Sequence, residues 1–124
     1  MARLLLIAAA GAAGTLARYG LSTWVRQWSG SGFPWGTLAV NGLGCLVFGV
    51  VLTLGREKGL LEDETATWIM VGFLGAFTTF STFAFESGDL LRAGEMGMAM
   101  LNVVANVALG LGLFFAGVWL ARVA

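Results

Sequence analysis

Four long apolar stretches, separated by short polar segments, limit what this chain can fold into. The 124 residues are 58% hydrophobic and 11% charged, with a mean hydropathy of +0.86. A soluble domain of this size could not hide so much apolar surface, whereas about 20 apolar residues suffice to cross a bilayer as a helix. The sequence therefore predicts an all-α integral membrane protein with a single domain over residues 1–124. Its four transmembrane helices are expected at about residues 3–27, 36–54, 65–89 and 96–121.

The third stretch contains a segment, Gly72–Phe83, whose residue types disfavour a continuous helix. Its second half is rich in hydroxyl side chains, which compete for backbone hydrogen bonds, and its glycines loosen the preceding turn. A helix over residues 65–89 would have its midpoint near Phe77, so we expect the third helix to be broken in the middle of the membrane. Backbone that leaves a helix there must be buried in protein or line a wet path, as it does in many ion sites.

The composition argues against an enzyme. The chain has no histidine, and its one cysteine, Cys45, lies in an apolar run. Seven basic residues balance seven acidic ones, so nothing favours a nucleic-acid partner. What remains is a set of uncharged hydrogen-bond donors: Asn41, Thr79, Ser81, Thr82, Asn102 and Asn106. Amide and hydroxyl groups of this kind can donate to an anion.

Each candidate residue also has a plainer interpretation. Phe80 and Phe83 share one helical face, and the positive edges of their rings could face an anion, but lipid contact or packing would also account for them. The asparagines could instead form hydrogen bonds that hold helices together. Arg18 could draw anions into a vestibule or anchor the chain at the membrane edge.

The basic residues predict an unusual topology. Four membrane helices place both termini on one side, together with Arg3, Arg56, Lys58 and Arg122, whereas Arg18, Arg26 and Arg92 lie toward the other side. Because orientation follows the Lys and Arg bias, this near balance predicts that the chain inserts both ways up. It could then pair antiparallel with a copy of itself.

Three motifs carry a resemblance that covers essentially the whole chain: Gly14–Tyr19, Gly36–Asn41 and, most specifically, Gly72–Phe83. On these the chain resembles the Fluc (CrcB-type) fluoride channels. The resemblance implies a dual-topology antiparallel homodimer in the bacterial inner membrane. It also implies passive export of cytoplasmic fluoride through two pores, which reduces fluoride toxicity.

The resemblance also assigns roles to single residues. Asn41, Phe80, Ser81, Thr82 and Phe83 would line the fluoride pathway. The backbone carbonyls of Gly75 and Thr78 from both subunits would hold a structural sodium ion, and Arg18 would lie near the vestibule. Asn102 and Asn106 stand where the family carries assorted polar residues, and we place them on the pathway too.

Two rival functions are weaker. A proton-coupled small multidrug transporter would also have four helices, but it needs a membrane carboxylate in its first helix, and no acid precedes Glu57. A purely structural membrane subunit fits the packing glycines but gives no reason for a broken third helix.

Overall fold

The computed structural model describes residues 1–30 and 32–124; Ser31, in the expected connector between the first two helices, lies outside the described residues. The described chain folds into helices, and the bounds are α1 Ala2–Ser29, α2 Trp35–Leu52, η1 Thr53–Glu57, α3 Asp63–Thr67, η2 Trp68–Leu74, α4 Gly75–Phe77, α5 Phe80–Arg92 and α6 Met96–Val123. The segments η1 and η2 are π-helical. Joined end to end, these elements form four helices that are long and apolar enough to span a membrane: Ala2–Ser29, Trp35–Glu57, Asp63–Arg92 and Met96–Val123. The predicted all-helical architecture with four such helices is confirmed.

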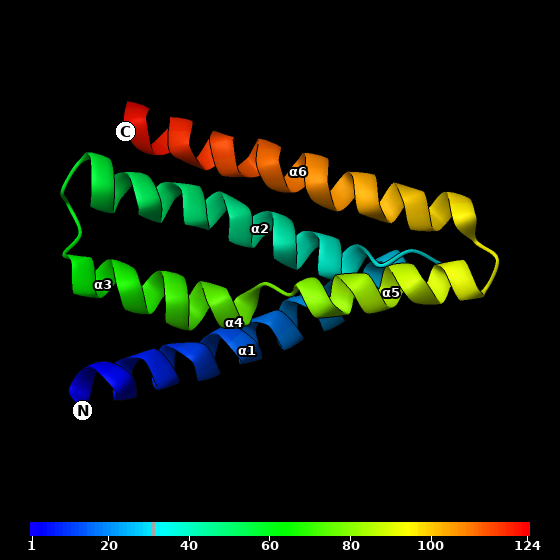
Figure 1. The fold of residues 1–124 in the computed structure, drawn as a ribbon, viewed down its shortest axis with the longest axis horizontal. Helices are drawn as coiled ribbons and strands as arrows, with labels where there is room; N and C mark the ends of the chain where they lie inside the picture. The colour runs from blue at the N-terminus through cyan, green and yellow to red at the C-terminus, as the bar shows by residue number, and fades with distance from the viewer. Residues whose placement is uncertain (31) are drawn as a thin grey trace.

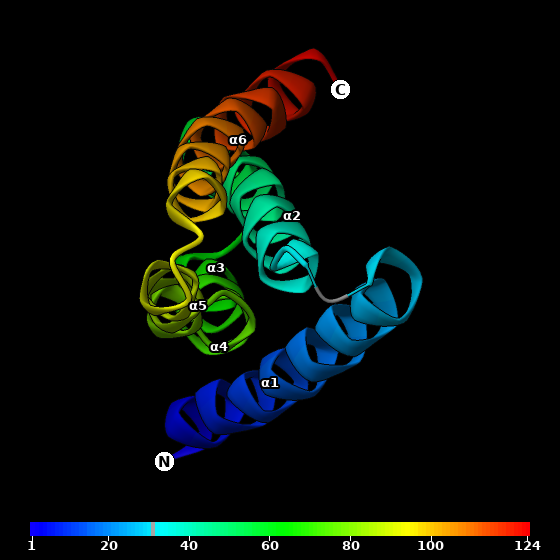
Figure 2. The same ribbon diagram turned by 90° about the vertical axis from the view of Figure 1, so that its right-hand side faces the viewer.

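Helix α2 is the centre of the molecule, with α6 along one side of it and α1 along another (Figure 2). Of its most apolar window 39% is buried, against 6% for α1 and 11% for α6. Glycines permit the close approach of α2 and α6, since a methyl group at Gly49 would overlap the Phe114 carbonyl and one at Gly117 the Leu46 carbonyl. Many large apolar side chains on the other helices point outward, as expected for surfaces in lipid.

Both termini lie at one end of the molecule, beside the connection from η1 to α3, and the turn from α5 to α6 lies at the other end (Figure 1). Gly59 and Gly94 allow these two turns, because their φ angles of 62° and 80° fall in the left-handed region. At the terminal end Arg122 donates to both carboxylate oxygens of Glu57, at 2.7 and 2.8 Å.

The third span is interrupted between α4 and α5 (Figure 1). Thr78 and Thr79 adopt extended backbone, with φ and ψ of −81° and 158° and of −150° and 113°. Thr79 then caps the next helix, because its hydroxyl accepts a hydrogen bond from the amide of Thr82 at 3.2 Å. The expected interruption is thus present, and its depth in a bilayer stays a prediction.

Candidate functional site

Asn41 of α2 stabilises the interrupted backbone. Its Oδ1 accepts from the Thr79 amide at 2.9 Å, and its Nδ2 donates to the Thr79 carbonyl at 3.2 Å. Thr79 is only 8% exposed, so its backbone groups would otherwise be unpaired in a nonaqueous environment. One carboxamide therefore replaces the hydrogen bonds that Thr79 loses by leaving the helix.

The same exchange frees two carbonyl groups. In a continuous α-helix the amides of Thr79 and Thr82 would donate to the carbonyls of Gly75 and Thr78. Here the Thr79 amide donates to Asn41 and the Thr82 amide to the Thr79 hydroxyl. The Thr78 hydroxyl is bonded to the Leu74 carbonyl at 3.0 Å. Within the described residues, the helix thus supplies no donor to the Gly75 and Thr78 carbonyls. Such oxygens are the ligands that hard cations prefer.

A chain of polar side chains runs from Asn41 across α6 to α5. Asn41 Nδ2 donates to Asn106 Oδ1 at 3.1 Å, and Asn106 Nδ2 donates to Asn102 at 2.9 Å to Oδ1 and 3.0 Å to the carbonyl. Asn102 Nδ2 in turn donates to Ser87 Oγ at 2.9 Å. The hydroxyl of Ser87 donates to the Phe83 carbonyl at 2.8 Å, which closes the chain back onto α5.

One side of this cluster opens into a pocket of about 340 Å³, which we call the aromatic pocket and whose lining includes Asn41, Thr79, Phe80, Phe83 and Asn106. The Phe80 and Phe83 rings are tilted by 55°, with centroids 5.5 Å apart. Phe80 is 78% exposed in the single chain. An aromatic side chain this exposed in a pocket lining is typical of a surface that another protein surface can cover.

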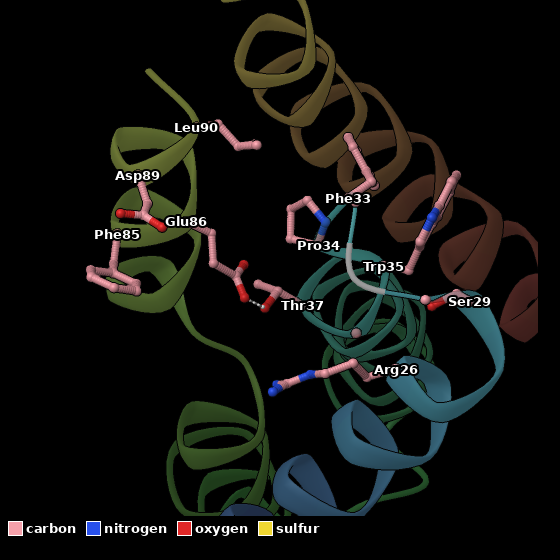
Figure 3. A pocket seen from close by; sticks show the side chains of 13 residues that line it. Arg26, Ser29, Phe33, Pro34, Trp35, Thr37, Phe85, Glu86, Asp89 and Leu90 are labelled. Carbon is pink, nitrogen blue, oxygen red and sulfur yellow. Dashed lines mark hydrogen bonds between the residues drawn. The ribbon is translucent and has the colours of Figure 1, made fainter. Parts of the chain in front are cut away.

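The other side opens into a pocket of about 260 Å³, which we call the vestibule and whose lining includes Arg18, Arg26, Thr37, Thr79, Thr82 and Glu86. An adjoining pocket of about 280 Å³ shares three of these residues, Arg26, Thr37 and Glu86 (Figure 3). Thr37 donates to Glu86 Oε1 at 2.8 Å, and Glu86 Oε2 is buried without a hydrogen-bond partner in the part of the chain that the structure describes. Arg26 reaches toward this region from α1 (Figure 3).

Thr79 belongs to both pockets. The vestibule and the aromatic pocket are therefore separated by the interrupted backbone and the Asn41 side chain that holds it.

Comparison with known proteins places this sequence in a family. The model of the family described as CrcB-like protein, Camphor Resistance (CrcB), matches residues 5–118. The chain belongs to the CrcB-like family. Among its relatives, the fluoride-specific ion channel FluC of Nitrosococcus oceani is 46% identical over 117 residues, which cover 94% of each chain. FluC of Solidesulfovibrio magneticus is 51% identical over 116 residues, or 94% of this chain and 93% of the relative. FluC of Thermus thermophilus is 48% identical over 115 residues, which cover 93% of this chain and 90% of the relative.

With four long apolar helices, this CrcB-like chain is a multi-pass membrane protein, and the three relatives named above come from bacteria. The structure brings most of the predicted site residues into the two pockets. Asn41, Phe80, Phe83 and Asn106 line the aromatic pocket. Arg18 and Thr82 line the vestibule.

Two predicted pathway residues lie elsewhere. Ser81 is exposed, with its hydroxyl 3.4 Å from that of Thr79, and it is not in the lining of either pocket. Asn102 is fully buried behind Asn106 and is likewise outside both linings. Its contacts make it a support for Asn106 in this CrcB-like chain rather than a wall of the pocket.

Sequence reasoning missed Thr37, Glu86 and Ser87 as members of the site. Thr37 lies four residues before Asn41, and Ser87 lies four residues after Phe83. Residues four apart share a helical face. This spacing was the signal that could have indicated Thr37 and Ser87 from the sequence of the CrcB-like chain.

Proposed function

We propose that this chain is a fluoride-selective passive ion channel, not an enzyme, that exports cytoplasmic fluoride across the bacterial inner membrane and so reduces its toxicity. The observation that carries the proposal is the meeting of two pockets at Thr79, whose backbone is held by Asn41. Among the described residues, hydroxyl and amide groups surround this meeting point, the rings of Phe80 and Phe83 line the pocket on one side of it, and no charged side chain belongs to both linings. The fluoride-specific relatives support fluoride as the permeant anion.

The hydrogen bonds suggest how an anion would pass. Arg18 and Arg26 attract it into the vestibule, where the Thr82 hydroxyl accepts from Thr79 at 3.0 Å and so keeps its own proton for the anion. Beyond the break, ring edges of Phe80 and Phe83 offer weak positive potential. Fluoride is held by donors that release it again, which conduction requires.

The amide groups of Asn41 and Asn106 can bind a passing anion only if they give up hydrogen bonds within the protein. Both N–H groups of each carboxamide already have protein acceptors. For either amide to donate to fluoride, one of these bonds must open. A small anion that accepts strong hydrogen bonds competes for such donors better than chloride, which is consistent with fluoride selectivity.

We further propose that the working unit is a dual-topology antiparallel homodimer with a sodium ion at its interface. The exposed Phe80 and the open aromatic pocket support a second copy as the missing wall. The Gly75 and Thr78 carbonyls fit a hard cation because the interruption has removed their helical donors. Two such carbonyls from each subunit would provide four oxygens, and the ion would tie the subunits together rather than travel with fluoride.

Flux from proteoliposomes tests the proposed function. Vesicles loaded with fluoride should empty down the fluoride gradient without a proton or sodium gradient, and chloride-loaded vesicles should retain their content. Protein-free vesicles serve as the control. Equal chloride flux would contradict selectivity, and a strict need for a proton gradient would favour the multidrug-transporter mechanism over a channel.

A further inference from the structure

Ser87 and Asn102 form a buried pair behind the aromatic pocket. Asn102 is 0% exposed and Ser87 is 8% exposed, and the bond between Asn102 Nδ2 and Ser87 Oγ is 2.9 Å. The pair joins α5 to α6 close to the turn that connects them. Neither residue is in the lining of the aromatic pocket or the vestibule.

The hydroxyl of Ser87 determines which way the Asn102 carboxamide faces. Its proton is donated to the Phe83 carbonyl at 2.8 Å, so toward Asn102 the Ser87 oxygen acts as an acceptor. Asn102 must therefore turn its NH₂ toward Ser87 and its Oδ1 toward the neighbour on α6, because a carboxamide has donors at one end and an acceptor at the other.

That orientation propagates along the chain. Asn106 meets Asn102 Oδ1 with its NH₂, which leaves Asn106 Oδ1 for Asn41. Asn41 in turn gives an N–H to Asn106 and keeps Oδ1 for the Thr79 amide. These are the only three asparagines in the sequence. The Ser87 hydroxyl sets the orientation at the Asn102 end of the series, the Asn102 backbone carbonyl also accepts from Asn106, and the Thr79 backbone sets the orientation of Asn41 at the other end.

We propose that Ser87 and Asn102 are positioning residues, which hold the Asn106 carboxamide with its Oδ1 toward Asn41 and so support the donors at the helix break. Without Ser87, the buried Asn102 N–H loses its acceptor, and no group on α5 then fixes which end of the Asn102 carboxamide faces that helix. A rotated Asn102 amide would set donor against donor at Asn106. The effect on ion selectivity rests on the proposed function, whereas the orientation of the amides does not.

Side-chain amide NMR tests the orientation directly. Selective ¹⁵N-asparagine labelling of the full chain in detergent micelles yields three NH₂ groups. In Ser87→Ala we expect changed chemical shifts for all three NH₂ groups. Hydrogen exchange of the Asn106 NH₂ should be about tenfold faster, because Asn102, which accepts its hydrogen bond, is no longer held in place. Ser87→Thr, which retains the hydroxyl, should preserve the wild-type spectrum. A change confined to Asn102 would overturn the proposal.

Ser29→Ala is the matched control. Ser29 donates to the Val25 carbonyl at 2.8 Å, the same bond to the residue four before that Ser87 makes with Phe83, but its hydroxyl serves no asparagine. This variant should leave the three NH₂ signals in place. If Ser87→Ala proves unfolded, Ser87→Ala with Asn102→Leu removes both buried polar groups, which is milder than removing one. The Asn106 and Asn41 signals should still shift in that double variant, and their constancy would overturn the proposal.

Ion flux then supplies the functional readout. We expect Ser87→Ala to lower the ratio of fluoride to chloride flux about tenfold, because the asparagine N–H donors are no longer held in one orientation. Ser87→Thr should have the wild-type ratio. Total flux is normalised to the folded fraction measured by thermal denaturation. A ratio unchanged in Ser87→Ala would mean that the pair is merely structural. Wild-type protein that does not conduct fluoride would overturn the proposed function, while the NMR result would still decide whether the pair positions the amides.

Discussion

At the scale of the residue, Asn41 connects the parts of the site. It forms hydrogen bonds with both backbone groups of Thr79 and donates a third to Asn106. We predict that Asn41→Leu abolishes fluoride flux and lowers the free energy of unfolding by about 1–3 kcal/mol, because buried backbone groups of Thr79 lose their partners. Thermal denaturation and proteoliposome flux measure the two effects. The control is Leu43→Ala, at a 43% exposed position of the same helix, which should change neither greatly. Wild-type flux from Asn41→Leu would contradict the role given to this residue.

At the scale of the element, the interrupted third span predicts where a substitution acts only through a second copy. A side chain at Gly75 has room within the chain, where an added Cβ would meet only the Met70 carbonyl at 3.6 Å, an ordinary contact. Gly75→Leu should therefore leave the monomer folded but crowd the dimer interface, so that both sodium binding and flux are lost. Thr78→Val keeps the carbonyl and should retain the ion and most of the flux.

Electron density on the two-fold axis of a crystallised dimer, together with size-exclusion chromatography, checks this pair of variants. Density with four carbonyl oxygens is expected for Thr78→Val and not for Gly75→Leu. An intact, conducting dimer of Gly75→Leu would rule out the placement of Gly75 at the interface, and fluoride flux coupled to sodium would rule out a structural ion.

At the scale of the whole molecule, the basic residues predict a chain that inserts in both orientations. Leu60→Lys with Glu62→Lys adds positive charge in the exposed connection at the terminal end, and Ala93→Lys with Glu95→Lys adds it at the opposite end. Each pair should hold its copy in one orientation, because Lys and Arg bias retains a loop in the cytoplasm. We expect either variant alone to lose fluoride flux and co-expression of both to restore it.

The matched control for the topology test is Leu60→Gln with Glu62→Gln, which alters the same exposed positions without adding positive charge. Fluoride resistance of cells and flux from purified protein give independent readouts. If one lysine variant conducts fully by itself, antiparallel pairing is wrong.

Much of the fold follows from hydrophobicity alone, because the cost of unpaired backbone in lipid leaves few architectures to a chain with four apolar stretches. The structure has spans at Trp35–Glu57 and Met96–Val123, where helices were expected at about residues 36–54 and 96–121. The interruption was also predictable, since hydroxyl side chains and glycines compete with the helix locally. The π-helical segments η1 and η2 were not anticipated, because they depend on how neighbouring helices pack.

For the site, too, one part follows from the sequence and another only from the tertiary structure. By itself the sequence determined which groups are available to the site: three asparagine amides, a run of hydroxyls and the rings of Phe80 and Phe83, with no acid in the first helix. Only the tertiary structure decided how they are used. It turned Asn41 onto the Thr79 backbone, placed Asn102 behind Asn106 rather than on a pocket wall, and set the Ser87 hydroxyl as the acceptor for Asn102. The physical reason is that a hydrogen bond has a direction. Which end of an amide faces a neighbour depends on what that neighbour already donates to, and this is settled by contacts between residues far apart in the chain.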